Sequence, residues 1–98
     1  MINKMTKQIR LADLLKGNNP LESFKHAAGE GVSIDPTSVD DDIYRIENLP
    51  DNNLIEFYEA ALFGMRICHR RKNKLDSETY SNIADYIYHI RASSHKKS

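Results

Sequence analysis

The amino-acid sequence predicts an all-α fold: a small bundle of four or five helices, the last two forming an antiparallel helical hairpin. Apolar residues recur at spacings of three and four along most of the chain, as in helices with one buried face. Alternation of apolar and polar residues, which is typical of half-buried strands, is nearly absent. Segments rich in glycine, asparagine and proline separate the periodic stretches and supply the turns of a helical bundle.

Two helices are predicted in the first third of the chain. The first spans Met5–Lys16 and stops at the Gly-Asn-Asn-Pro sequence of residues 17–20. Glycine accepts the left-handed conformation that ends a helix, and proline cannot continue one. The second is a short helix over Leu21–Ala28, with Pro20 in its first turn.

A third helix is predicted in the middle of the chain, over Val39–Leu49. A brief extended piece, Val32–Ile34, precedes it, with Asp35-Pro36 as a turn. Aspartates at the start of this helix suit the positive end of its dipole. Pro50 ends it.

The last two helices are the longest. One spans residues 52 to about 72, with Asp51 as its N-cap, and the other begins at residue 76 or 77 and ends near residue 92. The turn between them is Asn73–Leu75. Because that turn is short, we expect the two helices to be antiparallel neighbours.

The totals set bounds on the kind of protein. With 98 residues, the chain is long enough for one domain, which we place at residues 1–92, followed by a polar tail at 93–98. A single cysteine excludes an internal disulfide framework and a four-cysteine zinc site. No apolar run approaches the ~20 residues of a membrane-spanning helix. We expect a soluble cytoplasmic protein that has no cofactor and no membrane partner.

The formal net charge of zero conceals an asymmetry. Residues 1–60 carry a net charge of minus five, and residues 61–98 carry plus five. A basic patch crowds the end of the predicted long helix: Arg66, His69, Arg70, Arg71, Lys72 and Lys74. It is either a solvated helix end that complements the dipole, or a surface for phosphates or an acidic protein. Glu78 and Asp85 on the outward face of the last helix argue against base-specific reading by that helix.

The predicted long helix has two apolar faces. With successive residues about 100° apart, the main stripe consists of Leu54, Tyr58, Ala61, Met65 and Cys68. A smaller group lies on the opposite side and consists of Ala60, Phe63 and Ile67. Either other helices cover this second group, or it is an exposed patch that binds a partner helix or a second copy of the chain.

No constellation of residues carries catalytic chemistry. The four histidines are scattered, and neither HExxH nor CxxC occurs. Cys68 and His69 are adjacent, but neighbours on a helix point about 100° apart and make a poor nucleophile–base pair. The Asp40–Asp42 run lacks the glycine and the distal glutamate of a calcium loop. We therefore expect a protein that is not an enzyme.

Three short pieces around the long helix point to a family. They are Leu49-Pro50-Asp51-Asn52-Asn53-Leu54, Phe57-Tyr58-Glu59-Ala60-Ala61 and, more loosely, Asn73-Lys74-Leu75. Together, over residues 49–75, they resemble the Hha/YmoA family, small helical proteins of enteric bacteria that bind the nucleoid protein H-NS and modulate gene silencing. The resemblance implies a regulator of a nucleic-acid-associated complex. Leu62-Phe63-Gly64 stands where the family has an Asp-His-Arg run, so the family's acidic partner contact has no counterpart here.

The leading hypothesis is a non-enzymatic regulatory or adaptor protein that binds another protein. Apolar anchors and an electrostatic rim would make the contact: Ala60, Phe63, Ile67, Arg66, Arg70 and Arg71. The alternative is a phage-, plasmid- or toxin-system inhibitor or immunity protein that blocks an enzyme through an acidic patch of Asp40, Asp41, Asp42 and Glu47. A homodimer and a weak, sequence-independent contact with nucleic acid are further candidates.

Overall fold

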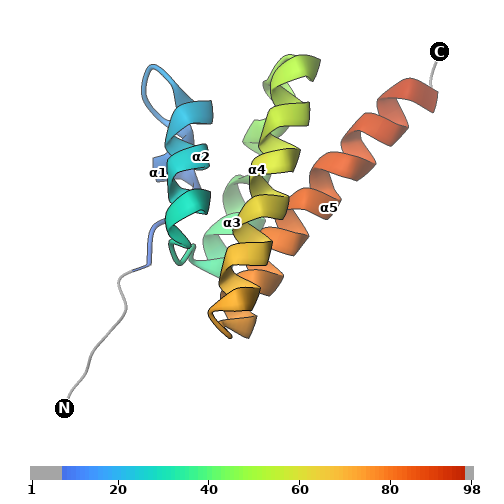
Figure 1. The fold of residues 1–98 in the computed structure, drawn as a ribbon. Coiled ribbons are helices and arrows are strands. Elements are labelled where there is room, and N and C mark those ends of the chain that lie inside the picture. Colours follow the sequence, from blue (N-terminus) through green and yellow to red (C-terminus); the bar gives the residue numbers. More distant parts are fainter. Residues whose placement is uncertain (1–7, 97–98) are drawn as a thin grey trace.

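The structure is a computed structural model that describes residues 8–96, with side chains described for residues 8–93. Within this part the chain forms five α-helices and one 3-10 helix, and it contains no β-strand. The elements are α1 (Leu11–Leu15), α2 (Pro20–Glu30), α3 (Pro36–Asp42), the 3-10 helix η1 (Ile43–Asn48), α4 (Asp51–Arg70) and α5 (Lys74–Lys96). The predicted all-α bundle is confirmed, and α4 and α5 form the predicted hairpin (Figure 1).

The first helix is shorter than predicted. Ile9 is extended and pairs with Ile34 in an isolated parallel bridge, in which the Ile9 amide donates to the Ser33 carbonyl at 3.0 Å. The helix predicted over Met5–Lys16 is therefore wrong at residues 8–10, and its first three residues lie outside the described part of the chain. The backbone bonds to the extended Ser33 segment replace helical bonds that the apolar spacing alone predicted.

The helix predicted over Val39–Leu49 is in fact two helices. α3 begins earlier than predicted, because the Asp35 carboxylate accepts the Thr37 amide at 3.0 Å and Pro36 takes the first helical position. From Ile43 the chain tightens into η1, in which residues three apart eclipse one another. The residues aligned in this way on the core are Ile43, Ile46 and Leu49.

α4 is one uninterrupted helix, as predicted, and it lies between α2 and α5 (Figure 1). Phe24 of α2 stacks on Phe57 of α4 with ring centroids 5.2 Å apart, and it approaches Tyr80 of α5 at 6.1 Å. Gly64 permits the close approach of α4 and α5, since a Cβ there would lie 2.8 Å from the Tyr80 ring. These contacts between three helices form the centre of the core.

α5 is longer than predicted. It runs to Lys96, so the boundary predicted after residue 92 does not coincide with the end of the helix, and the rest of the predicted tail lies outside the described residues. It also begins earlier than predicted, at Lys74 instead of residue 76 or 77, so the predicted turn is wrong at Lys74 and Leu75. The reason is the cap at Asn73, whose side-chain oxygen accepts the Asp76 amide at 3.2 Å. No helix within residues 8–96 has the length and apolar character that crossing a membrane requires.

Candidate interaction surface

The six residues of the predicted basic patch meet where α4 ends and α5 begins. All are exposed, and they come from the last turns of α4, the connecting residues and the first residue of α5. We call this surface the basic tip: Arg66, His69, Arg70, Arg71, Lys72 and Lys74. The six basic side chains, which span nine positions of the sequence, therefore lie at one end of the hairpin.

Hydrogen bonds in the turn hold the basic tip in place. Lys72 has a left-handed backbone conformation (φ 61°), and its amide donates to the His69 carbonyl at 2.9 Å. The next amide, that of Asn73, donates to the Cys68 carbonyl at 2.8 Å. Together they satisfy the last carbonyl groups of α4. The backbone that carries Lys72 and Lys74 thus has a defined path.

The carboxylate nearest to the turn faces the interior. Asp76 is buried. Its Oδ2 accepts hydrogen bonds from the Ser33 hydroxyl at 2.5 Å and from the side-chain Nδ2 of Asn73 at 2.6 Å. Burial, followed by the charge of Asp76, raises the pKa of the Cys68 thiol. Cys68 is consequently a buried thiol of low reactivity, and Asp76 forms no ion pair with the basic-tip cations among the described side chains.

Two adjoining hollows lie along the α4–α5 junction. The larger, of about 620 Å³, is lined by His69, Lys72, Lys74, Ser77 and Glu78. The smaller, of about 380 Å³, is lined by Met65, Arg66, His69, Arg70 and Ser77. Because His69 and Ser77 line both, we treat them as one groove. The Ser77 hydroxyl donates to the Met65 carbonyl at 3.3 Å, which ties the floor of the groove to α4.

Ion pairing separates the cations into two groups. Away from the basic tip, every lysine and arginine whose side chain is described forms an ion pair with a carboxylate: Arg10, Lys16, Lys25, Arg45 and Arg91. Among the described side chains, none of the basic-tip cations has a carboxylate within ion-pair distance. Arg71 is used within the fold, because its guanidinium donates to the Glu30 carbonyl at 3.0 Å and links α4 to the end of α2.

The second apolar group of α4 is divided by the packing of α2. Ala60 is buried in the core, and Ile67 is half-buried beside Gly31, where an added Cβ would lie 3.2 Å from it. Phe63 remains 51% exposed, with only the edge of its ring near Gly29. Coverage by another helix thus accounts for Ala60 and much of Ile67. Phe63 is open to solvent on the outer face of the helix, and Arg66 and Arg70 follow it about one and two turns later.

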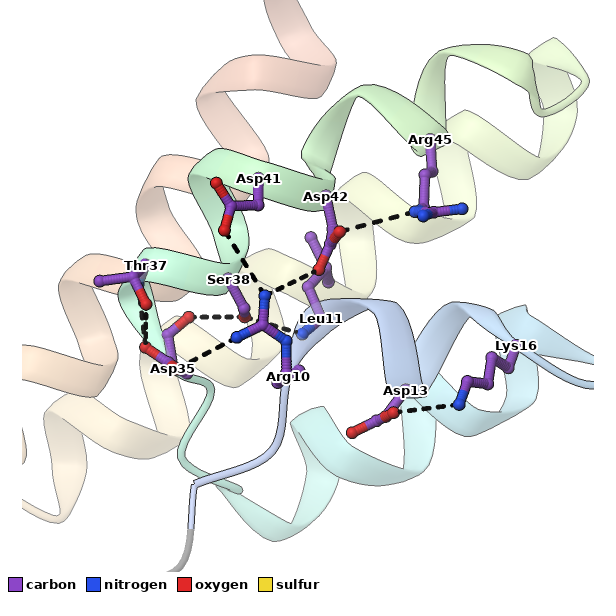
Figure 2. Close-up of polar contacts among 10 residues, drawn as sticks. All are labelled: Arg10, Leu11, Asp13, Lys16, Asp35, Thr37, Ser38, Asp41, Asp42 and Arg45. Atoms are coloured by element: carbon purple, nitrogen blue, oxygen red, sulfur yellow. Dashed lines mark hydrogen bonds and ion pairs between the residues drawn. The ribbon is translucent and has the colours of Figure 1, made fainter.

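The predicted acidic patch is largely engaged with neighbours of its own. The Arg10 guanidinium lies 3.8 Å from Asp35, 3.5 Å from Asp41 and 3.7 Å from Asp42, and Figure 2 shows it among all three carboxylates. Arg45 lies 3.6 Å from the other oxygen of Asp42. Arg10 therefore neutralises much of the negative charge that the sequence places in this region.

Glu47, the last residue of the predicted acidic patch, also has a partner. It accepts a hydrogen bond from the Tyr86 hydroxyl of α5, and this bond raises the pKa of Tyr86 to about 12. Of the four acidic-patch residues, Asp40 is the one for which we find no side-chain partner among the described residues.

Sequence reasoning missed three features of these surfaces. Arg10 is far in sequence from the aspartates that it contacts, and nothing in the pattern singles it out. Tyr44 of η1 is 52% exposed, although it is adjacent in sequence to the apolar Ile43. Leu75 is 74% exposed beside the basic tip. Its position outside the three-and-four stripe of α5 was a signal that could have found it.

The described surface offers contacts through charge and apolar area. Among the described residues, no three histidine, cysteine or acidic side chains gather so that they could hold a metal ion. Comparison of the chain with protein-family models, with curated proteins and with solved structures finds no match in any of the three. The resemblance to the Hha/YmoA family therefore stays a prediction.

Proposed function

We propose that this chain is a cytoplasmic, non-enzymatic regulatory or adaptor protein that binds another protein through the outer face of α4. Phe63 supplies the apolar anchor, and Arg66 and Arg70 follow it along the same side of the helix. The observation that carries the proposal is that Phe63 is 51% exposed on a rigid helix, next to two arginines without an ion-pair partner among the described residues. A partner with an apolar pocket and an acidic border complements this surface.

The spacing supports one contact surface. Phe63 and Arg70 are seven residues apart and Arg66 lies between them, so all three project from the same side of α4. Aromatic and arginine side chains contribute most of the binding free energy in many protein interfaces. Because the surface belongs to a helix that is packed on two sides, little backbone conformational entropy is lost on binding. Ala60 is buried and Arg71 bonds to the Glu30 carbonyl, so both contribute to the packing of α2 on α4.

The test uses two aromatic residues of matched exposure. A photo-crosslinking amino acid replaces Phe63 in one protein and Tyr44, which is 52% exposed on η1, in another. We expect cross-linking in the native host lysate at position 63 and little at position 44. Phe63→Ser should abolish capture of the cross-linked protein without lowering the melting temperature by more than a few degrees, while Tyr44→Ser should leave capture intact. Equal cross-linking at both positions, or unfolding caused by Phe63→Ser, would refute the proposal.

The identity of the captured protein separates the alternatives. A nucleoid or transcription protein supports the regulator that the Hha/YmoA resemblance implies, whereas a nuclease or toxin supports the inhibitor alternative. The structure favours the inhibitor less, because Arg10 and Tyr86 already occupy most of the acidic patch. Capture of this same chain would indicate a homodimer, which a mass measurement in solution checks.

A further inference from the structure

We propose that the groove at the basic tip binds the phosphate backbone of double-stranded nucleic acid without reading its sequence. This inference shares Arg66 and Arg70 with the protein-binding proposal, but it does not need Phe63 and it adds Lys72 and Lys74, which that proposal does not use. Arg66 and Arg70 border the adjoining hollow. The carrying observation is that these cations surround a groove while the other described lysines and arginines are paired.

Among the described residues, no ion pair opposes the charge at the basic tip. Asp76 is buried and bonded to Ser33 and Asn73, so Glu78 is the one carboxylate among the residues that line the groove. The 20 residues of α4 make a rod of about 30 Å, and Asp51 lies at its opposite end. Because the Debye length is about 8 Å at physiological ionic strength, carboxylates at that end hardly lower the potential at the basic tip.

The positions of the cations suit phosphate groups. They come from three separate pieces of chain, namely the end of α4, the turn and the start of α5, and they line both hollows of the groove. Lys72 lies in the left-handed turn, and Lys74 is the first residue of α5. Lysine binds phosphate as a point charge and arginine binds it through its guanidinium fork. About four simultaneous phosphate contacts are therefore available.

The lining of the groove favours nucleic acid over an acidic protein. The buried centre of a protein interface is enriched in aromatic residues and depleted in lysine. The larger hollow has no aromatic residue and contains Lys72 and Lys74. A membrane surface fits less well, because Leu75 is a single exposed apolar side chain and not an apolar helix face, and Asp85 and Glu78 lie on the outward side of α5.

Phosphate contacts position a protein on a duplex but carry no sequence information. Base reading would require α5 to enter a groove of the duplex, and Glu78 and Asp85 on that helix repel the phosphates that line it. Binding should therefore be independent of sequence and strongly dependent on salt. With about four contacts, the slope of log affinity against log salt should be about −3 to −4, equivalent to roughly a 100-fold loss between about 50 and 200 mM salt.

The experiment measures fluorescence anisotropy with two labelled DNA duplexes of about 20 base pairs and unrelated sequence, over a salt series. We expect the intact chain to bind both duplexes equally. Lys72→Gln and Lys74→Gln should each weaken binding several-fold and reduce the salt slope by about one. The matched control is Lys16→Gln, an exposed lysine that is paired with Asp13, and it should leave both quantities unchanged.

Phe63→Ser separates this inference from the protein-binding proposal, because it should abolish partner capture and leave DNA binding intact. Circular dichroism confirms that each variant keeps the helical content of the parent chain. Absence of binding to either duplex at about 50 mM salt would overturn the inference. So would a slope that the two lysine variants leave unchanged, a preference for one duplex, or equally tight binding to polyglutamate or to phosphatidylglycerol vesicles.

Discussion

The segment from α1 to η1 and the α4–α5 hairpin use charge in opposite ways. In the first region, helices of 5 to 11 residues depend on caps and ion pairs, with Arg10 held among carboxylates and Asn19 accepting the Glu22 amide at 3.2 Å. In the hairpin, two long helices are held by buried apolar contacts and by the Asp51–Arg91 ion pair, and the cations at its tip have no ion-pair partner among the described residues. Short helices are marginal by themselves, so caps and ion pairs add to their packing, while the long hairpin leaves the charges of its tip for a partner.

The largest expected effect comes from the aromatic contact that joins the two regions. Phe57→Ala removes a fully buried ring that stacks on Phe24. The loss of buried area and the cavity left behind should lower the free energy of unfolding by about 3–5 kcal/mol, measured by urea denaturation. Leu75→Ala, at a residue that is 74% exposed, should change it by less than about 0.5 kcal/mol. Comparable losses of unfolding free energy in the two variants would show that the Phe24–Phe57 contact does not dominate the stability of the core.

The next effect tests the close approach within the hairpin. Gly64→Ala places a Cβ 2.8 Å from the Tyr80 ring, which is buried and cannot move freely. We expect the free energy of unfolding to fall by about 1–3 kcal/mol. Gly29→Ala on α2 is the matched control, since its Cβ would lie at an ordinary 3.8 Å from Phe63 and should raise stability by up to about 1 kcal/mol. Stabilisation by both variants would mean that α4 and α5 can separate at no cost.

A smaller effect compares a cation that serves the fold with one that does not. Arg10→Gln leaves the buried Asp42 Oδ2, which has no hydrogen-bond partner, without its nearest cation. Because Arg10 is itself partly exposed, we expect a loss of only about 1 kcal/mol in thermal unfolding, reduced further by added salt. Lys72→Gln should be neutral or slightly stabilising, since it removes repulsion at the basic tip. Equal losses of stability in the two variants would contradict the division into cations that stabilise the fold and basic-tip cations that do not.

The smallest effect is a dependence on pH confined to the first region. The hydrogen bonds from the Thr37 hydroxyl and amide hold the pKa of Asp35 below its ordinary value of 3.8. A lowered carboxyl pKa in the folded state means that Asp35 stabilises the fold above pH 3.8 and that this contribution disappears as the pH falls through the lower value. Asp35→Asn should therefore flatten the acid limb of the stability curve. Identical acid limbs for the intact chain and Asp35→Asn would show that Asp35 does not contribute to the pH dependence of stability.

The sequence predicted correctly those parts of the fold in which apolar residues recur with a strong helical periodicity. α4 and the stripe of Tyr80, Ile83 and Ile87 on α5 follow the three-and-four spacing closely, and both were predicted with their correct partner. α1 and the α3–η1 segment were predicted less well. Their ends depend on a backbone bridge from Ile9 and on the cap at Asp35, which are contacts of single residues and leave no periodic signal.

The candidate surfaces show the same division. The composition and order of residues 66–74 were enough to predict a basic surface, because a helix end followed by a short turn keeps neighbouring residues together in space. The partners of those charges were not predictable. Arg10 meets Asp41 across 31 positions, whereas no described carboxylate reaches Lys72 or Lys74.

The sequence by itself determined the all-helical class, the hairpin and the position of the basic cluster, since these follow from the spacing of apolar residues and from short connections. Only the tertiary structure decided which charges are neutralised and which apolar side chains remain open. That outcome depends on how α2 lies against α4, which buries Ala60 and leaves Phe63 exposed. Such packing is a property of surfaces brought together from distant parts of the chain, and local spacing does not specify it.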